Sequence, residues 1–132
     1  MTPEERFEQT VLFEVVETSL PLWEVASEAA VLGSDLDSTS RIAKARELVR
    51  RLLKRRWVEL LETEYLGDET PAPPERLVAP TRVEAVLEDP DVWDYERVGD
   101  ARTRYLLYRT ELGAREFKQQ LMREESERGS TE

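Results

Sequence analysis

The sequence predicts a mainly helical α+β fold with one small antiparallel β-hairpin. Apolar residues recur at helical spacing over most of the chain, and two short runs, 57–65 and 105–108, have the composition of strands. The chain has 132 residues, of which 39% are hydrophobic, a size that fits one domain with a single core. We therefore expect one domain over residues 1–123 and a disordered tail over residues 124–132, which lack apolar side chains.

Two helices are expected before the middle of the chain. Thr2, followed by Pro3 and Glu5, forms a capping-box pattern, so the first helix should begin there and end near Glu17. Its apolar face is broad, which fits either a central place in the core or a contact with a second copy. A second, shorter helix should follow Pro21 and end just before Gly33.

The third expected helix is strongly cationic and begins at Asp37 or Ser38 as N-cap. Eight basic residues against one Glu give residues 41–56 a charge of +7, whereas the whole chain carries −10, which leaves −17 on the rest. The apolar side chains fall on one helix face and most basic ones on the other. Because like charges four residues apart repel, this helix predicts an anionic neighbour. That neighbour is either a phosphate backbone or carboxylates of the chain itself, unless the helix is simply a solvated face.

The cationic helix should pass directly into a strand at 57–65, where aromatic and β-branched residues replace the basic ones. A loop rich in Gly and Pro should follow at 67–74. A second capping-box pattern, formed by Thr81 and Glu84, predicts a short helix that ends at Asp89.

The last part of the chain should return to the first strand. A loop is expected at 98–101, and the run 105–108 should form a strand antiparallel to the first. Thr110 has the position of an N-cap for a final helix with apolar residues at helical spacing. We expect this helix to end near Met122.

The composition argues against an enzyme. The chain has neither Cys nor His, which removes most zinc sites, cysteine nucleophiles and histidine-dependent catalysis. Acidic groups such as Glu62 with Glu64, or Asp89 with Asp91 and Asp94, could hold a divalent cation. With 29 acidic residues in the chain, however, such groups arise by chance. We therefore expect no catalysis, no cofactor and no metal.

The sequence contains no run of 18 apolar residues, and its first residues are acidic where a secretory signal would be basic and then apolar. The absence of Cys also fits a reducing compartment. We expect a cytoplasmic protein that does not enter a membrane.

The order of the expected elements resembles a winged helix-turn-helix protein. RRLLKRRWVELL, residues 50–61, resembles the junction between the recognition helix and the first wing strand of that family. YLLYRTELGAREF, residues 105–117, resembles the end of the second wing strand in regulators similar to the MarR and PadR groups. In this comparison, residues 66–100 are an insertion longer than an ordinary wing, and the turn at 33–37 is also long.

The resemblance implies a homodimeric transcriptional regulator whose helix 38–56 enters the major groove of double-stranded DNA. Nine residues would contact the DNA. Five would lie nearest base edges or phosphates, namely Ser38, Thr39, Ser40, Arg41 and Lys44, and four would track the DNA backbone, namely Arg50, Arg51, Lys54 and Arg55. The alternative is a protein–protein interaction module of the same fold that does not bind DNA. Basic side chains paired with carboxylates would favour this alternative, and unpaired ones on a convex face would favour DNA.

Overall fold

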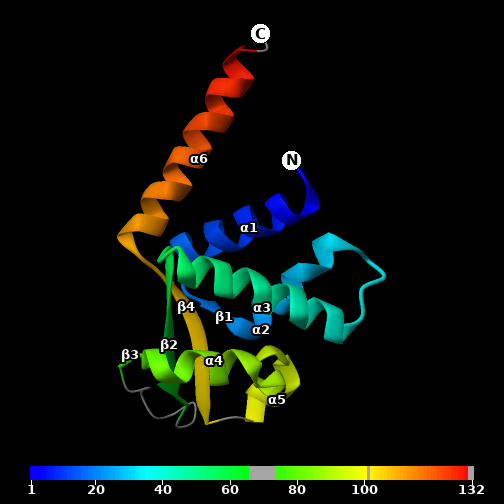
Figure 1. The fold of residues 1–132 in the computed structure, drawn as a ribbon, viewed down its shortest axis with the longest axis vertical. Helices are drawn as coiled ribbons and strands as arrows, with labels where there is room; N and C mark the ends of the chain where they lie inside the picture. Colours follow the sequence, from blue (N-terminus) through cyan, green and yellow to red (C-terminus); the bar gives the residue numbers. More distant parts are fainter. Residues whose placement is uncertain (66–73, 101, 131–132) are drawn as a thin grey trace.

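A computed structural model describes residues 1–65, 74–100 and 102–130 (Figure 1). The protein is mainly helical with a small antiparallel sheet, so the expected α+β class is confirmed. Its elements, in chain order, are α1 (Pro3–Glu17), β1 (Leu20–Pro21), α2 (Leu22–Glu28), the 3₁₀ helix η1 (Ala29–Leu32), α3 (Ser38–Lys54), β2 (Val58–Glu64), β3 (Arg76–Leu77), α4 (Pro80–Glu88), the 3₁₀ helix η2 (Pro90–Trp93), α5 (Tyr95–Asp100), β4 (Thr103–Arg109) and α6 (Glu111–Ser130).

The sheet has the strand order β1-β4-β2-β3, and each neighbouring pair is antiparallel. Its centre is the expected hairpin of β2 and β4, which pairs from Val58 with Arg109 to Glu64 with Thr103. The two outer strands were not expected. Each has only two residues, too few to show the alternation by which a strand is recognised in a sequence.

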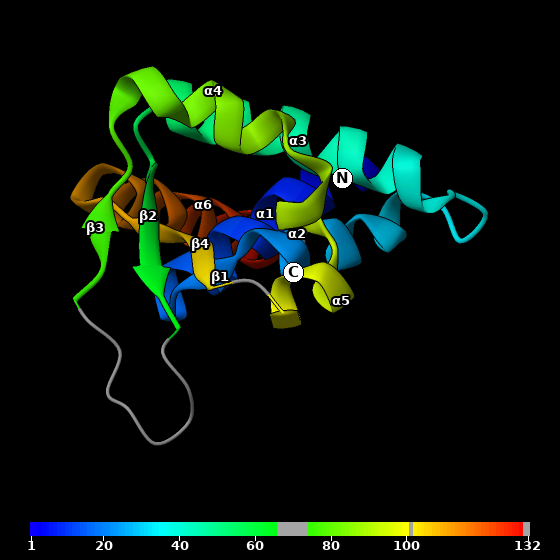
Figure 2. The same ribbon diagram turned by 90° about the horizontal axis from the view of Figure 1, so that it is seen from below.

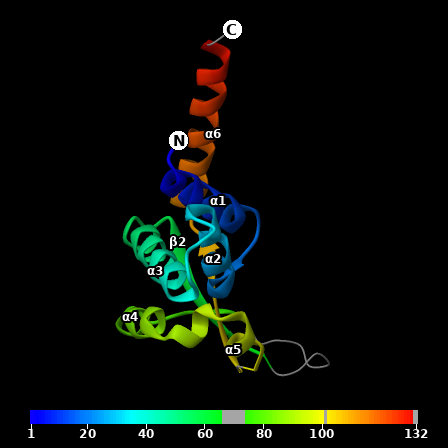
Figure 3. The same ribbon diagram turned by 90° about the vertical axis from the view of Figure 1, so that its right-hand side faces the viewer.

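The core lies where α1, α2 and α3 pack together and against the sheet (Figure 3). α3 buries Ala45, Leu48, Val49 and Leu52, which confirms that one face of the cationic helix is apolar and packed. Its basic side chains lie on the remaining surface of the helix. The packing of α3 is thus fixed by apolar contacts that leave most of its cations outside the core.

Local capping patterns predicted several helix starts. Thr2 accepts a hydrogen bond from the backbone N–H of Glu5 at 3.1 Å, and Asp37 accepts one from that of Ser40 at 2.7 Å. Thr81, by contrast, is not a cap: α4 begins at Pro80, and its N-cap, Ala79, makes no side-chain capping bond. Proline at the first helical position, with its preset backbone angle, starts this helix two residues earlier than the Thr81 pattern suggested.

The start of α6 is joined closely to the end of α3. Thr110 accepts from the N–H of Gly113 at 3.0 Å and donates its hydroxyl proton to the carbonyl of Arg56 at 2.7 Å. A Cβ added to Gly113 would lie 2.0 Å from the carbonyl oxygen of Trp57. The Thr-x-x-Gly pattern therefore serves a close approach of two backbones, for which only glycine leaves room.

Residues between β2 and β4 form β3, α4, η2 and α5. Val86, Leu87 and Trp93 of this insertion are buried, and the indole N–H of Trp93 donates to the carbonyl of Leu87 at 2.9 Å. The insertion is therefore part of the core. The loop expected at 98–101 is instead the end of α5 up to Asp100, while Ala101 and residues 66–73 of the expected Gly- and Pro-rich loop lie outside the described residues.

The final helix is longer than expected. α6 was predicted to end near Met122 and the chain to be disordered from residue 124, but the helix continues to Ser130. Glu and Arg favour helices although they bury little, so a lack of apolar residues did not mean a lack of structure. Figures 1 and 3 show α6 projecting from the body of the protein beyond α1. None of the described helices combines the length and the hydrophobicity needed to cross a membrane.

Candidate nucleic-acid interface on the cationic helix

The cationic helix α3 has a neighbour along each side. α4, from the insertion, lies beside α3 (Figure 2), and α1 contributes Glu8 near the C-terminal end of α3. Some basic residues of α3 are therefore paired with residues of α1 or α4, and the others are not.

α4 occupies Arg50. Its Nε donates to Glu84 Oε1 at 2.8 Å, and its Nη2 contacts the carboxylates of Glu84 and Glu88. The hydrogen bond to Glu84 is the main reason why the pKa of Arg50 lies above its ordinary value, and the charge of Glu88 adds to it. Arg46 Nε donates to the carbonyl oxygen of Leu87 at 2.6 Å. The C-terminal half of α3 is thus held by α4 on one side.

Glu8 of α1 forms ion pairs with two further arginines. Its Oε1 lies 2.6 Å from Arg55 Nη1 and 3.7 Å from Arg51 Nε. The guanidinium of Arg55 also stands over the ring of Trp57, 4.8 Å from the ring centre. Of the four residues expected to track the DNA backbone, Arg50, Arg51 and Arg55 are therefore paired within the chain.

The N-terminal half of α3 is more open. Ser38, Thr39 and Lys44 are exposed, and Ser40 is half-buried. Within the described parts of the chain, no carboxylate lies within 4.0 Å of Lys44 or of the remaining backbone-tracking residue, Lys54.

Arg41 differs from its neighbours. It lines a cavity of about 190 Å³ between α2, α3 and the insertion, together with the side chains of Trp23 and Tyr95. Its Nε is buried and has no hydrogen-bond partner among the described residues. Arg41 is therefore directed at least partly into the protein, and it is a poorer candidate for a DNA contact than Lys44.

The nine predicted residues thus do not form one continuous basic surface. The structure brings Ser38, Thr39, Ser40 and Lys44 together at one end of α3, while the arginines at the other end are engaged by acidic residues. Glu47, exposed between the two groups, pairs with Arg51 at 3.9 Å. No protein-family model, curated protein or solved structure matches the chain, so its function is inferred from this geometry.

The acidic groups noted in the sequence have structural roles. Glu62 is buried in β2, and its two oxygens accept from the two terminal nitrogens of Arg82 at 3.1 Å each. The Arg82 guanidinium holds the pKa of Glu62 below its usual range, with a smaller effect of Arg76. Asp89 and Asp94 accept hydrogen bonds from backbone N–H groups two residues ahead. These contacts fasten the insertion to β2 and shape its turns.

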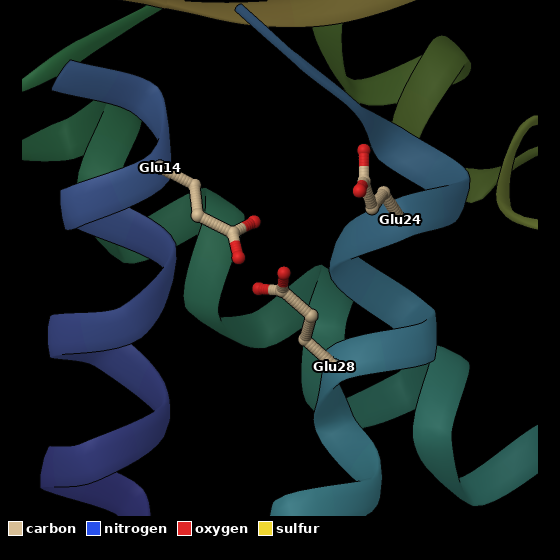
Figure 4. Close-up of side chains that lie close together, drawn as sticks. All are labelled: Glu14, Glu24 and Glu28. Atoms are coloured by element: carbon tan, nitrogen blue, oxygen red, sulfur yellow. The ribbon is translucent and has the colours of Figure 1, made fainter. Parts of the chain in front are cut away.

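A different acidic cluster was missed in the sequence. Glu14 of α1 and Glu24 and Glu28 of α2 point toward one another (Figure 4), with one carboxylate oxygen of each within 4.8 Å of the others. Carboxylates at this spacing could hold a divalent cation such as Ca²⁺. The spacing of Glu24 and Glu28 places both on one helix face, but nothing local places Glu14 opposite them.

The environment of this cluster favours the protonated state of Glu28. Burial, followed by the hydrogen bond and the charge of Glu14, raises the pKa of Glu28 to about 8. Burial also raises the pKa of Glu24. The Oε2 atoms of Glu14 and Glu28 are buried without hydrogen-bond partners among the described residues. The raised pKa of Glu28 therefore favours a proton on this carboxyl at neutral pH.

Proposed function

We propose that this chain is a winged-helix protein that binds double-stranded DNA in a sequence-specific way and regulates transcription. The element order supports this proposal: α1, α2 and α3 precede the β2–β4 hairpin, and β4 pairs with β1 on its other side. In this arrangement α2 and α3 are the helix-turn-helix, and the hairpin is the wing that carries the insertion. The proposal includes no catalytic step, and it fits the cytoplasmic location expected from the sequence.

The observation that carries the proposal is the open N-terminal half of α3. In helix-turn-helix complexes the N-terminal residues of the recognition helix contact base edges, and a helix N-terminus attracts phosphate. Here that half presents the hydroxyls of Ser38 and Thr39 and the ammonium of Lys44, none of them paired with a carboxylate in the described structure, while the Asp37 carboxylate caps the helix N-terminus by accepting from the N–H of Ser40. We therefore assign DNA contact to this half and to the unpaired Lys54, and we assign Arg50, Arg51 and Arg55 to ion pairs within the chain.

The proposed contact surface predicts weak salt dependence. Lys44 and Lys54 are the exposed predicted site cations that lack a carboxylate neighbour in the described structure, whereas Arg41, also without an ion pair there, is partly buried. Each phosphate contact contributes about −0.9 to the slope of log K against log salt. Fluorescence anisotropy of a labelled duplex of random sequence, measured at several salt concentrations, should give a slope near −2 by that estimate.

A variant pair makes the test specific. Lys44→Glu should weaken binding at least about tenfold at low salt, since a carboxylate would face the phosphates. Arg123→Glu, which makes the same charge change on the distant end of α6, is the control and should have little effect. Absence of DNA binding by the unmodified chain at low salt would contradict the proposal.

The second candidate function is a protein-interaction module of the same fold. Two observations favour it. Arg50, Arg51 and Arg55 form ion pairs with carboxylates of the chain itself, and the whole chain has a net charge of −10. Such a molecule repels a polyanion at long range. This candidate predicts no binding to random duplex even at low salt, and an unchanged result for Lys44→Glu.

A further inference from the structure

A cavity of about 190 Å³ lies between the N-terminal part of α3, α2 and the insertion. Arg41 of α3, Trp23 of α2, and Asp94 and Tyr95 of the insertion are among the residues that line it. The insertion is longer than an ordinary wing, so the resemblance to winged helix-turn-helix proteins implies nothing about this cavity. What the cavity can bind follows from the charges and the rings along its walls.

The cationic group at the cavity is the guanidinium of Arg41. Its Nε is buried and has no hydrogen-bond partner among the described residues. No carboxylate in the described parts of the chain lies within 4.0 Å of the guanidinium. A buried donor without a partner is unfavourable, above all on a charged group, and a guanidinium can bind both oxygens of a carboxylate. Arg41 is therefore suited to hold a carboxylate that enters the cavity.

The anionic group at the cavity is the carboxylate of Asp94, which is exposed. Its Oδ1 accepts a hydrogen bond from the backbone N–H of Glu96 at 3.0 Å. Among the described residues, Asp94 has no basic side chain within 4.0 Å, so it forms no ion pair with Arg41. A carboxylate has several acceptor positions, and those of Oδ2 remain for an ammonium group. The cavity thus offers one positive and one negative group that do not pair with each other.

Aromatic rings supply the apolar part of the cavity. The rings of Trp23 and Tyr95 meet edge to face, with their centres 4.7 Å apart. Trp93, which also lines the cavity, is buried, and its indole N–H is already bonded to the carbonyl of Leu87. Tyr95 is 66% exposed. An apolar group bound beside Tyr95 would remove part of this ring from water, which is favourable.

We propose that this cavity binds a free α-amino acid with an aliphatic side chain. The carboxylate of the ligand pairs with Arg41, its ammonium group pairs with Asp94, and its side chain packs on the rings of Trp23 and Tyr95. The volume suits such a small ligand, since sites for drug-sized molecules begin at about 300 Å³. A carboxylic acid without an ammonium group would bring its negative charge near Asp94, and an amine without a carboxylate would leave Arg41 unpaired. The two charges therefore select a zwitterion.

The test is isothermal titration calorimetry of the full chain with L-leucine and with L-valine, at ligand concentrations up to about 10 mM, a range that covers weak affinities. Both amino acids should bind saturably, with one molecule per chain. N-acetyl-L-leucine lacks the ammonium group, and L-leucinamide lacks the carboxylate. Each of these probes should bind at least about tenfold more weakly than L-leucine, because each leaves one charged group of the cavity without its partner.

Two variants connect each charge of the ligand to its residue. Arg41→Gln should weaken L-leucine binding at least about tenfold and should remove the preference for L-leucine over L-leucinamide. Asp94→Asn should remove the preference for L-leucine over N-acetyl-L-leucine, while the amide oxygen can still accept from the N–H of Glu96. A loss of fold could not produce these separate changes in preference. Arg115→Gln on α6 and Asp91→Asn in the insertion, exposed changes that do not line this cavity, are the matched controls.

Three results would overturn the proposal. The first is that neither amino acid binds the unmodified chain. The second is that N-acetyl-L-leucine or L-leucinamide binds as tightly as L-leucine, since one of the two charges would then have no role. The third is that a control variant weakens binding as much as Arg41→Gln. All measurements are made without DNA, so their outcome is independent of the proposed function.

Discussion

Arg50 of α3 and Glu84 of α4 meet at 2.8 Å, which joins the cationic helix to an acidic helix of the insertion. Glu88, one turn further along α4, contacts the same guanidinium. The insertion thus supplies two carboxylates in the place where a recognition helix would need to meet phosphate. Under the proposed function, this pairing keeps Arg50 from contacting DNA, which leads to the first prediction.

Removal of these carboxylates should strengthen DNA binding. In the double variant Glu84→Gln with Glu88→Gln, Arg50 loses both anionic partners and becomes available to phosphate. We expect the affinity for duplex DNA to rise severalfold at low salt and the salt slope to steepen by about 0.9, the contribution of one phosphate contact. Fluorescence anisotropy measures both quantities.

The control for this variant removes the same charge elsewhere. Glu4→Gln with Glu17→Gln changes two exposed residues of α1 that contact no arginine of α3 in the described structure. If this control strengthens DNA binding equally, the gain in affinity comes from the smaller net negative charge. Arg50 would then not contact DNA.

Glu28 should make the protein less stable as pH rises. Its folded pKa of about 8 lies above the ordinary value of 4.5, so the folded state holds a proton that the unfolded state has lost. The contribution of Glu28 is fully present below pH 4.5 and is lost as pH rises toward 8. Glu28→Gln should therefore stabilise the protein at pH 9 by about 1 kcal/mol, a value reduced for the partial exposure of the site.

Thermal unfolding at pH 5 and pH 9 measures this effect. The melting temperatures of Glu28→Gln and of the unmodified chain should diverge as pH rises. Glu17→Gln, an exposed change on α1, should follow the unmodified chain. Parallel pH profiles for all three proteins would mean that Glu28 is not held in its protonated form.

Glu62, by contrast, should make the protein less stable as pH falls. Because Arg82 lowers its folded pKa, Glu62 contributes stability that is present above its unfolded pKa of about 4.5 and is lost as pH falls through the folded value. Glu62→Gln should lower the free energy of unfolding at pH 7 by about 1–2 kcal/mol, since the buried site loses a charge-assisted pair. Urea unfolding measures this free energy. Glu59→Gln, an exposed change on the same strand, is the control. Equal stability of the two variants would contradict a structural role for the Glu62 pair.

Gly113→Ala should be strongly destabilising. The added Cβ would lie 2.0 Å from the carbonyl oxygen of Trp57, so α6 would have to shift away from the end of α3. Overpacking of this kind typically costs about 1–3 kcal/mol. Gly33→Ala is the matched control, because the nearest atom to its added Cβ is a side-chain oxygen of Asp35 at 3.1 Å. Similar denaturant midpoints for the two variants would show that α6 moves aside easily.

What could be predicted from the sequence was local. The caps at Thr2, Asp37 and Thr110 and the apolar face of α3 depend on residues a few positions apart, so their patterns were readable. The strands β1 and β3 were not predicted, because each exists only through its pairing with a distant strand. The extension of α6 was missed because a polar sequence was taken as disordered.

In the candidate site, too, the local features were predictable and those that depend on distant residues were not. The extent and charge of α3 were predicted, but which of its arginines are available depends on Glu8, Glu84 and Glu88. These carboxylates come from two other helices, one of them in the insertion. Their positions depend on the packed core, which no spacing in the sequence specifies.

The carbonyl oxygen of Leu87 accepts from both the guanidinium of Arg46 and the indole of Trp93. A carbonyl oxygen has two lone pairs, so both acceptor positions of this atom are taken. Were the insertion to swing outward, Arg46 and Arg50 of α3 would lose their acceptors on α4 together, whereas Trp93 would move with Leu87. The insertion and α3 should therefore move as one rigid unit. A ligand or partner that displaces one of them would also displace the other.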